Sequence, residues 1–222
     1  MKPFDARHFW KWFMRNNQTL LHLSDLEKNE IEFWDTEMLM HAKAVCPKGV
    51  EIDIIVDEDD SHASLILTSS GDQRYFKEIE LLAEESPHIE CWDIYALYPP
   101  MVMDFKIDHL FKDTGIDPDE LYFNPEETEK AEGECHLTVW SGDEVDISAQ
   151  YAKAVKRVLL NLLGERLFAR EITSFTVRLI KEASEQTCNG LFPLELLPGW
   201  VADNLFSAYE VSKQGLIVPR IQ

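Results

Sequence analysis

The sequence contains none of the short glycine-rich motifs that mark nucleotide-binding and acyl-transfer enzymes. It has no Gly-x-x-x-x-Gly-Lys-Ser/Thr phosphate loop, no Gly-x-Gly-x-x-Gly fingerprint and no Gly-x-Ser-x-Gly nucleophile elbow. The seven histidines are scattered and stand in no recognisable base motif. Because catalytic residues assemble in space, these absences lower the expectation of an enzyme without removing it. We therefore assign no catalytic, cofactor-binding or metal-binding residue from the sequence.

Basic residues are scarce. The 222-residue chain has 21 lysines and arginines against 41 aspartates and glutamates, a formal charge of −20. A surface of that sign disfavours non-specific binding to nucleic acid or to anionic membranes. The composition is therefore typical of an ordinary acidic surface, or of a chain that binds a basic protein partner. It predicts neither a nucleic-acid nor a membrane partner.

Long apolar runs and paired cysteines are missing too. No stretch approaches the roughly 20 apolar residues of a transmembrane helix, and the first 13 residues lack the uninterrupted apolar segment of a secretory signal. The cysteines never form Cys-x-x-Cys, and such dispersed thiols are typical of a reducing compartment. We expect a cytoplasmic protein with four unpaired cysteines, Cys46, Cys91, Cys135 and Cys188.

The apolar fraction of 45% is enough for a large core, and its clearest pattern covers residues 50–98. Two β-branched runs predict strands at 50–56 and 63–68. An apolar stripe over 74–85 predicts an amphipathic helix, and 91–97 predicts a third strand that Pro99-Pro100 ends. This segment is thus expected to form a ββαβ unit.

A similar order returns later in the chain. We predict a strand at 135–140, a helix at 148–163 that Gly164 ends, and a strand at 172–180. The segments LILTSSGD and LTVWSGD occupy equivalent positions in the two halves. We interpret the whole as an α+β fold with two pseudo-repeated ββαβ units. They are expected to share one mostly antiparallel sheet with helices on one face.

The predicted elements are expected to form a single α+β domain over residues 1–222. Its parts are a helical N-terminal segment (1–49), the first unit (50–100), the second unit (120–181) and a tail packed back on the body (182–222). The tail carries too many large apolar side chains to leave them all in water.

Local signals refine these parts. A helix is predicted at 4–16, opened by Asp5, and another at 35–46. Between these two helices, Ser24 and Glu27 are expected to form a capping box. The aromatic residues of the first helix are expected to pack in the core. Short strands are predicted at 105–110 and 121–123, a solvated acidic loop at 124–134, and a short helix at 201–209.

The order and spacing of five segments resemble an uncharacterised bacterial protein family, a domain of unknown function. The resemblance covers about residues 9–180, and its segments are FWKWF (Phe9–Phe13), LILTSSGD (Leu65–Asp72), CWDIYALYPP (Cys91–Pro100), LTVWSGD (Leu137–Asp143) and LLGE (Leu162–Glu165). The family has no assigned activity. The resemblance therefore implies an α+β bacterial protein and assigns no catalytic residue.

Two sets of nitrogen and sulfur ligands are candidate metal sites. The first is formed by His88 and Cys91 at the start of one predicted strand, with Cys135 and His136 at the start of another. Adjacent residues of a strand point to opposite faces, which favours ordinary packing for this set. The second is His41 with Cys46, which do not share a helix face well.

Acidic groups give the remaining candidates. The turns at 57–60 and 143–146 carry oxygen ligands for a divalent cation, but neither has EF-hand spacing, so solvated turns are favoured. Glu165 is either a functional acid or a surface acid. An enzyme using carboxylates is expected to place them near Gly71-Asp72 or Gly142-Asp143.

The leading hypothesis is a non-enzymatic cytoplasmic protein that acts as an interaction or regulatory module. A sharper form is an acidic neutraliser of a basic partner. The alternative is a carboxylate- or metal-dependent enzyme. A homodimer built on an edge strand or on the Trp10–Trp12 surface is compatible with each of these.

Overall fold

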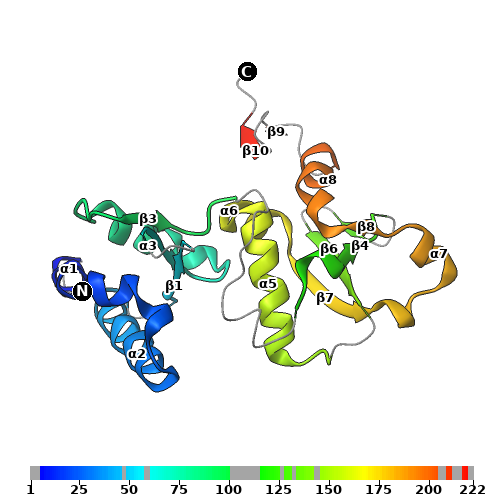
Figure 1. The fold of residues 1–222 in the computed structure, drawn as a ribbon. Helices are drawn as coiled ribbons and strands as arrows, with labels where there is room; N and C mark the ends of the chain where they lie inside the picture. The colour runs from blue at the N-terminus through cyan, green and yellow to red at the C-terminus, as the bar shows by residue number, and fades with distance from the viewer. Residues whose placement is uncertain are drawn as a thin grey trace. The chain divides into compact units, whose positions relative to one another are not determined.

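In the computed structural model the chain divides into two compact units, residues 1–98 and 99–222 (Figure 1). The structure describes residues 6–46, 49–57, 61–100, 116–125, 128–131, 134–142, 146–204, 209–211 and 217–219. The predicted α+β class with N-terminal helices is confirmed. The single-domain organisation stays a prediction.

The first unit packs helices against a three-stranded sheet. Its helices are α1 (Arg7–Leu21), α2 (Lys28–Val45) and α3 (Phe76–Glu84), and its strands are β1 (Glu51–Val56), β2 (Ala63–Thr68) and β3 (Trp92–Ala96). β1 pairs antiparallel with β2, and β2 pairs parallel with β3, so that Leu65 lies between Ile54 and Ile94. The predicted ββαβ order of residues 50–98 is confirmed.

Aromatic side chains of α1 form the centre of this unit's core. Phe9, Trp10 and Phe13 are buried, and the Phe13 ring meets the Trp92 ring edge-on with 4.9 Å between centroids. The Trp10 indole N–H donates a hydrogen bond to the Leu82 carbonyl oxygen at 2.8 Å. The core prediction for these three aromatics is confirmed. Since Trp10 is only 3% exposed, the hypothesis of a Trp10–Trp12 dimer surface is wrong.

The second unit is built around β6 (Glu134–Ser141). Its other elements are β4 (Leu121–Phe123), β5 (Glu129–Ala131), α5 (Ala149–Leu163), α6 (Glu165–Glu171), β7 (Ser174–Leu179), α7 (Glu185–Asn189), β8 (Phe192–Pro193), α8 (Leu197–Asn204), β9 (Tyr209–Val211) and β10 (Ile217–Pro219). β6 pairs parallel with β7 and antiparallel with β4 and β5. β4 also pairs with β8, while β9 and β10 form a separate two-stranded ribbon.

Helix α5 supplies most of this unit's apolar core, with buried side chains that include Val155, Val158 and Leu159. Ser148 caps its first turn by accepting a hydrogen bond from the Tyr151 backbone N–H. The Tyr151 hydroxyl hydrogen-bonds in turn with the Ser141 hydroxyl at the end of β6, which ties the helix to the sheet.

The prediction of one shared sheet is wrong. Strands β1–β3 form one mixed sheet, and β4–β8 form another. In both, the middle strand (β2 or β6) is antiparallel to the strand before it and parallel to the strand after the helical segment. The pseudo-repeat itself stays a prediction.

Two local predictions of the N-terminal half need correction. Residues 28–45 form one continuous helix, so the separate helix at 35–46 is wrong. The capping box lies one turn later than expected, because Glu27 is the cap and Glu30 reaches back to its N–H. A 3-10 turn occupies Leu23–Asp25 instead. Asp5 and the predicted strand at 105–110 lie outside the described residues.

Two further corrections concern the second unit. The expected solvated loop at 124–134 contains β5, which pairs with the start of β6, and buries Asn124 and Thr128. The predicted helix at 201–209 begins earlier, at Leu197, and its described part ends at Asn204. Leu194 and Leu197 of the tail are buried as expected, whereas Phe192 and Leu196 stay exposed.

Candidate functional site

Two histidines and two tryptophans contact one another where α1 packs against α2 in the first unit. We call this group the His–Trp cluster, and it consists of His8, Trp12, Trp34 and His41. The His8 Nε2 and His41 Nδ1 atoms are 3.1 Å apart. The Trp12 ring stacks on the His41 ring with 4.7 Å between centroids and 24° between planes. Trp34 lies against Trp12, at a centroid distance of 6.4 Å.

Helical spacing brings these side chains together. His8 and Trp12 are four residues apart on α1, and Trp34 and His41 are seven residues apart on α2, so each pair shares a helix face. The two helices pack against one another and bring the two pairs into contact. Sequence reasoning missed the cluster because the two histidines are 33 positions apart. The His8/Trp12 spacing was the available signal.

Burial lowers the pKa of His41, and the nearby His8 lowers it further, while the Glu37 carboxylate acts in the opposite direction. The fold therefore favours the neutral imidazole. Neutral rings can share one hydrogen bond across the 3.1 Å gap, because a neutral imidazole carries one donor nitrogen and one acceptor nitrogen.

This shift predicts a loss of stability in mild acid. With the folded-state pKa below the ordinary value, the unfolded chain binds the His41 proton first. The stabilisation present above about pH 6.5 is then lost progressively as the pH falls toward the lower, folded-state value. We expect the urea midpoint to fall between pH 7.5 and 5.5, and to fall less in His41→Gln. Equal pH dependence in the two proteins would contradict this expectation.

The outer face of α2 points away from the core. It consists of Phe33, Thr36, Met40 and Lys43, and all four are exposed. Phe33 and Met40 are 55% and 54% exposed, an unusual amount for large apolar side chains in one stripe. Four acids flank the stripe along the same helix, Glu30, Glu32, Asp35 and Glu37. The face thus carries two exposed apolar side chains, with Lys43 at its C-terminal end and four acids along its flanks.

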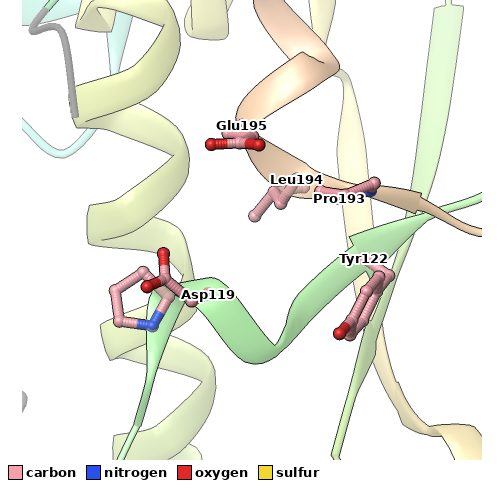
Figure 2. A pocket seen from close by; sticks show the side chains of 6 residues that line it. Asp119, Tyr122, Pro193, Leu194 and Glu195 are labelled. Carbon is pink, nitrogen blue, oxygen red and sulfur yellow. The ribbon is translucent and has the colours of Figure 1, made fainter.

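The second unit holds a pocket of about 320 Å³ beside β4 and β8 (Figure 2). Asp119 and Tyr122 line it from the segment that ends in β4, and Leu194 and Glu195 line it from the segment after β8. Asp119 and Glu195 are exposed. Water screens both carboxylates, so the pocket lacks the buried environment that usually tunes a catalytic acid.

The four residues of the first candidate metal site differ in their surroundings. His88 is exposed and Cys91 half-buried in the first unit. In the second unit Cys135 is buried, whereas the His136 ring hydrogen-bonds with the Ser174 and Thr176 hydroxyls at 2.7 and 3.1 Å. Cys135 and His136 therefore occupy different environments, as adjacent strand residues do.

His41 and Cys46 also lie apart. The His41 ring faces α1, whereas the buried Cys46 thiol donates to the Glu78 carbonyl oxygen at 3.7 Å. Burial, and then the charge of Glu78, raise the pKa of Cys46 to about 11. A thiol of that pKa is a poor nucleophile and a poor metal ligand at neutral pH.

The acidic candidates have structural surroundings where they are described. Asp72 caps a 3-10 turn by accepting from the Arg74 backbone N–H, and its carboxylate also accepts from the Arg74 side chain. Glu165 is fully buried at the start of α6, so its interpretation as a surface acid is wrong. Of the two acidic turns, residues 58–60 and 143–145 lie outside the described part.

Within the described residues, no group of three or more His, Cys, Asp and Glu side chains is arranged to hold a metal ion. Among the helices of that same part of the chain, none is both long and apolar enough to cross a bilayer. No protein-family model, curated protein or solved structure matches the chain.

Proposed function

We propose that this chain is a non-catalytic cytoplasmic interaction module that binds a basic protein partner on the outer face of α2. The observation that carries the proposal is the pair Phe33 and Met40, which leave more than half of each side chain in water on one helix face. Aromatic residues and methionine are enriched at protein interfaces.

Charge complementarity determines the kind of partner. The four acids along α2 and the net charge of −20 surround the apolar stripe with negative potential. An anionic lipid surface is repelled by these acids. A helix with an apolar stripe between lysines and arginines matches both features, because its apolar face covers Phe33 and Met40 while its basic flanks meet the acids.

The test uses a synthetic amphipathic helical peptide with leucines on one face and lysines and arginines on its flanks. We expect it to bind the full chain, and to bind more weakly as salt rises, because screening acts on exposed charges. Phe33→Ser and Met40→Ser should each weaken binding by about tenfold or more, the cost of about 1.4 kcal/mol at an interface anchor. Fluorescence anisotropy of the labelled peptide gives the affinity.

The matched control is Leu196→Ser. Leu196 is 50% exposed, like the two anchors, but belongs to the second unit, whereas α2 belongs to the first. Unchanged binding in Phe33→Ser and Met40→Ser, or equal loss in Leu196→Ser, would contradict the docking face. A dimer in light scattering that Phe33→Ser dissolves would assign the face to a second copy of the chain.

The alternative, a carboxylate-dependent enzyme, draws support from the pocket that Asp119 and Glu195 line. Turnover of a small-molecule substrate that is lost in Glu195→Gln would overturn the non-catalytic proposal. That outcome is distinguishable from a failure of the docking face, because Glu195 lies in the second unit and α2 in the first.

A further inference from the structure

We propose that His8 and His41 together bind a late first-row divalent metal ion, of the class of Cu²⁺, Ni²⁺ and Zn²⁺, where α1 packs against α2. The two ring nitrogens that face each other are 3.1 Å apart. With metal–nitrogen bonds of about 2.0–2.1 Å, nitrogens at that separation subtend an angle of about 100° at a shared ion. Such an angle suits both tetrahedral and square-planar coordination.

Each neutral imidazole can offer one ring-nitrogen lone pair to the metal ion without losing a proton. Each neutral ring keeps one N–H, and it can reside on the nitrogen that faces away, so His8 Nε2 and His41 Nδ1 are both free to coordinate. The surroundings that favour a neutral His41 also favour metal binding, because a protonated ring has no lone pair to offer.

The ring of His41 is held in place before any ion arrives. Trp12 stacks on it at 4.7 Å, and His8 lies one helical turn before Trp12 on α1. Because the ligands come from two helices that already pack together, little conformational entropy is lost on binding. An ion shared by α1 and α2 also acts as a clamp between them and stabilises the folded first unit.

Water completes the coordination sphere. Since the described residues offer no third His, Cys, Asp or Glu arranged with this pair, the two imidazoles are its protein ligands. Glu37 lies one turn before His41 on α2, and its charge acts on that ring. A carboxylate near a metal ligand can accept a hydrogen bond from metal-bound water. A site with two protein ligands exchanges its ion readily, unlike a four-ligand structural zinc site.

The test is a titration of the full chain with CuCl₂, NiCl₂ and ZnCl₂ at pH 7.5. Calorimetry should give one ion per chain, and Cu²⁺ and Ni²⁺ should quench part of the tryptophan fluorescence, because Trp12 touches His41. His8→Gln and His41→Gln should each weaken the affinity at least about tenfold and remove the quenching. Bound metal should raise the thermal midpoint of the wild-type chain, and should raise it less or not at all in His8→Gln and His41→Gln.

Two control variants separate this site from others. His88→Gln removes an exposed histidine elsewhere in the first unit, and Glu195→Gln removes an acid of the second unit's pocket. Both should bind the ion as the wild type does. If His41→Gln does not fold, the metal affinity of His8→Gln tests the proposal. That variant should fold, because the His8 side chain is exposed on α1. The absence of saturable binding overturns the proposal, as does wild-type affinity in His8→Gln.

Discussion

Replacing Trp10 by alanine should destabilise the first unit by about 3–5 kcal/mol, the usual cost of truncating a buried aromatic side chain. Trp10 is 3% exposed and meets Phe9 and Phe13 edge-on at centroid distances of 4.8 and 5.9 Å. The truncation leaves a cavity beside Phe9 and Phe13 in the core. It also leaves the Leu82 carbonyl oxygen without the indole donor. Urea unfolding followed by far-UV circular dichroism measures the loss.

Trp10→Phe separates the two contributions. Phenylalanine keeps most of the apolar volume and removes the N–H that donates to Leu82, so the expected loss is about 1–3 kcal/mol. Trp12→Ala serves as a comparison on the same helix, because Trp12 is only half-buried and should cost less. An equal loss of unfolding free energy in Trp10→Ala and Trp12→Ala would contradict the placement of Trp10 in the core.

Sequence patterns predicted the elements whose signal is local. Strands β1, β2 and β3 and helix α3 follow from alternation and helical periodicity within a few residues. Strand β5 was missed because Glu129 and Lys130 carry no apolar alternation, and they become a strand only by pairing with β6. Propensity also gave no sign that residues 28–45 form one helix, since Asp35 and Thr36 are weak helix formers in its middle.

The candidate sites were harder to predict than the fold. Composition indicated an acidic chain, but the position of the exposed stripe depends on which face of α2 packs against α1. The His8–His41 contact depends on the same packing, and no spacing within one element specifies it. His41 and Cys46 are close along the chain, whereas the spatial neighbour of His41 is His8 on another helix.

Gly164 is another position whose role depends on tertiary packing. Its place in the sequence predicted only that a helix ends there. Its φ of 74° and ψ of 145° fall in a region that residues with a side chain rarely adopt. A Cβ at this position would lie 2.9 Å from both the backbone nitrogen and the Cδ of Pro100. The backbone nitrogen cannot rotate away as a flexible side chain can. A side chain at this position would therefore meet both an unfavourable backbone conformation and a steric overlap.

Gly164→Ala should therefore destabilise the second unit by about 2–4 kcal/mol, the sum of a strained φ and a backbone overlap. Gly199→Ala is the matched control, because Gly199 lies in α8 of the same unit and nothing lies within 4 Å of its added Cβ. That change should be neutral or stabilise by about 0.5–1 kcal/mol, since alanine favours helix. Urea unfolding of both variants measures the difference.

If the chain folds as the single domain that the sequence predicts, Gly164→Ala and Trp10→Ala should lower the midpoint of one common transition. Two transitions, each shifted by only one of the variants, would instead mean that residues 1–98 and 99–222 unfold separately.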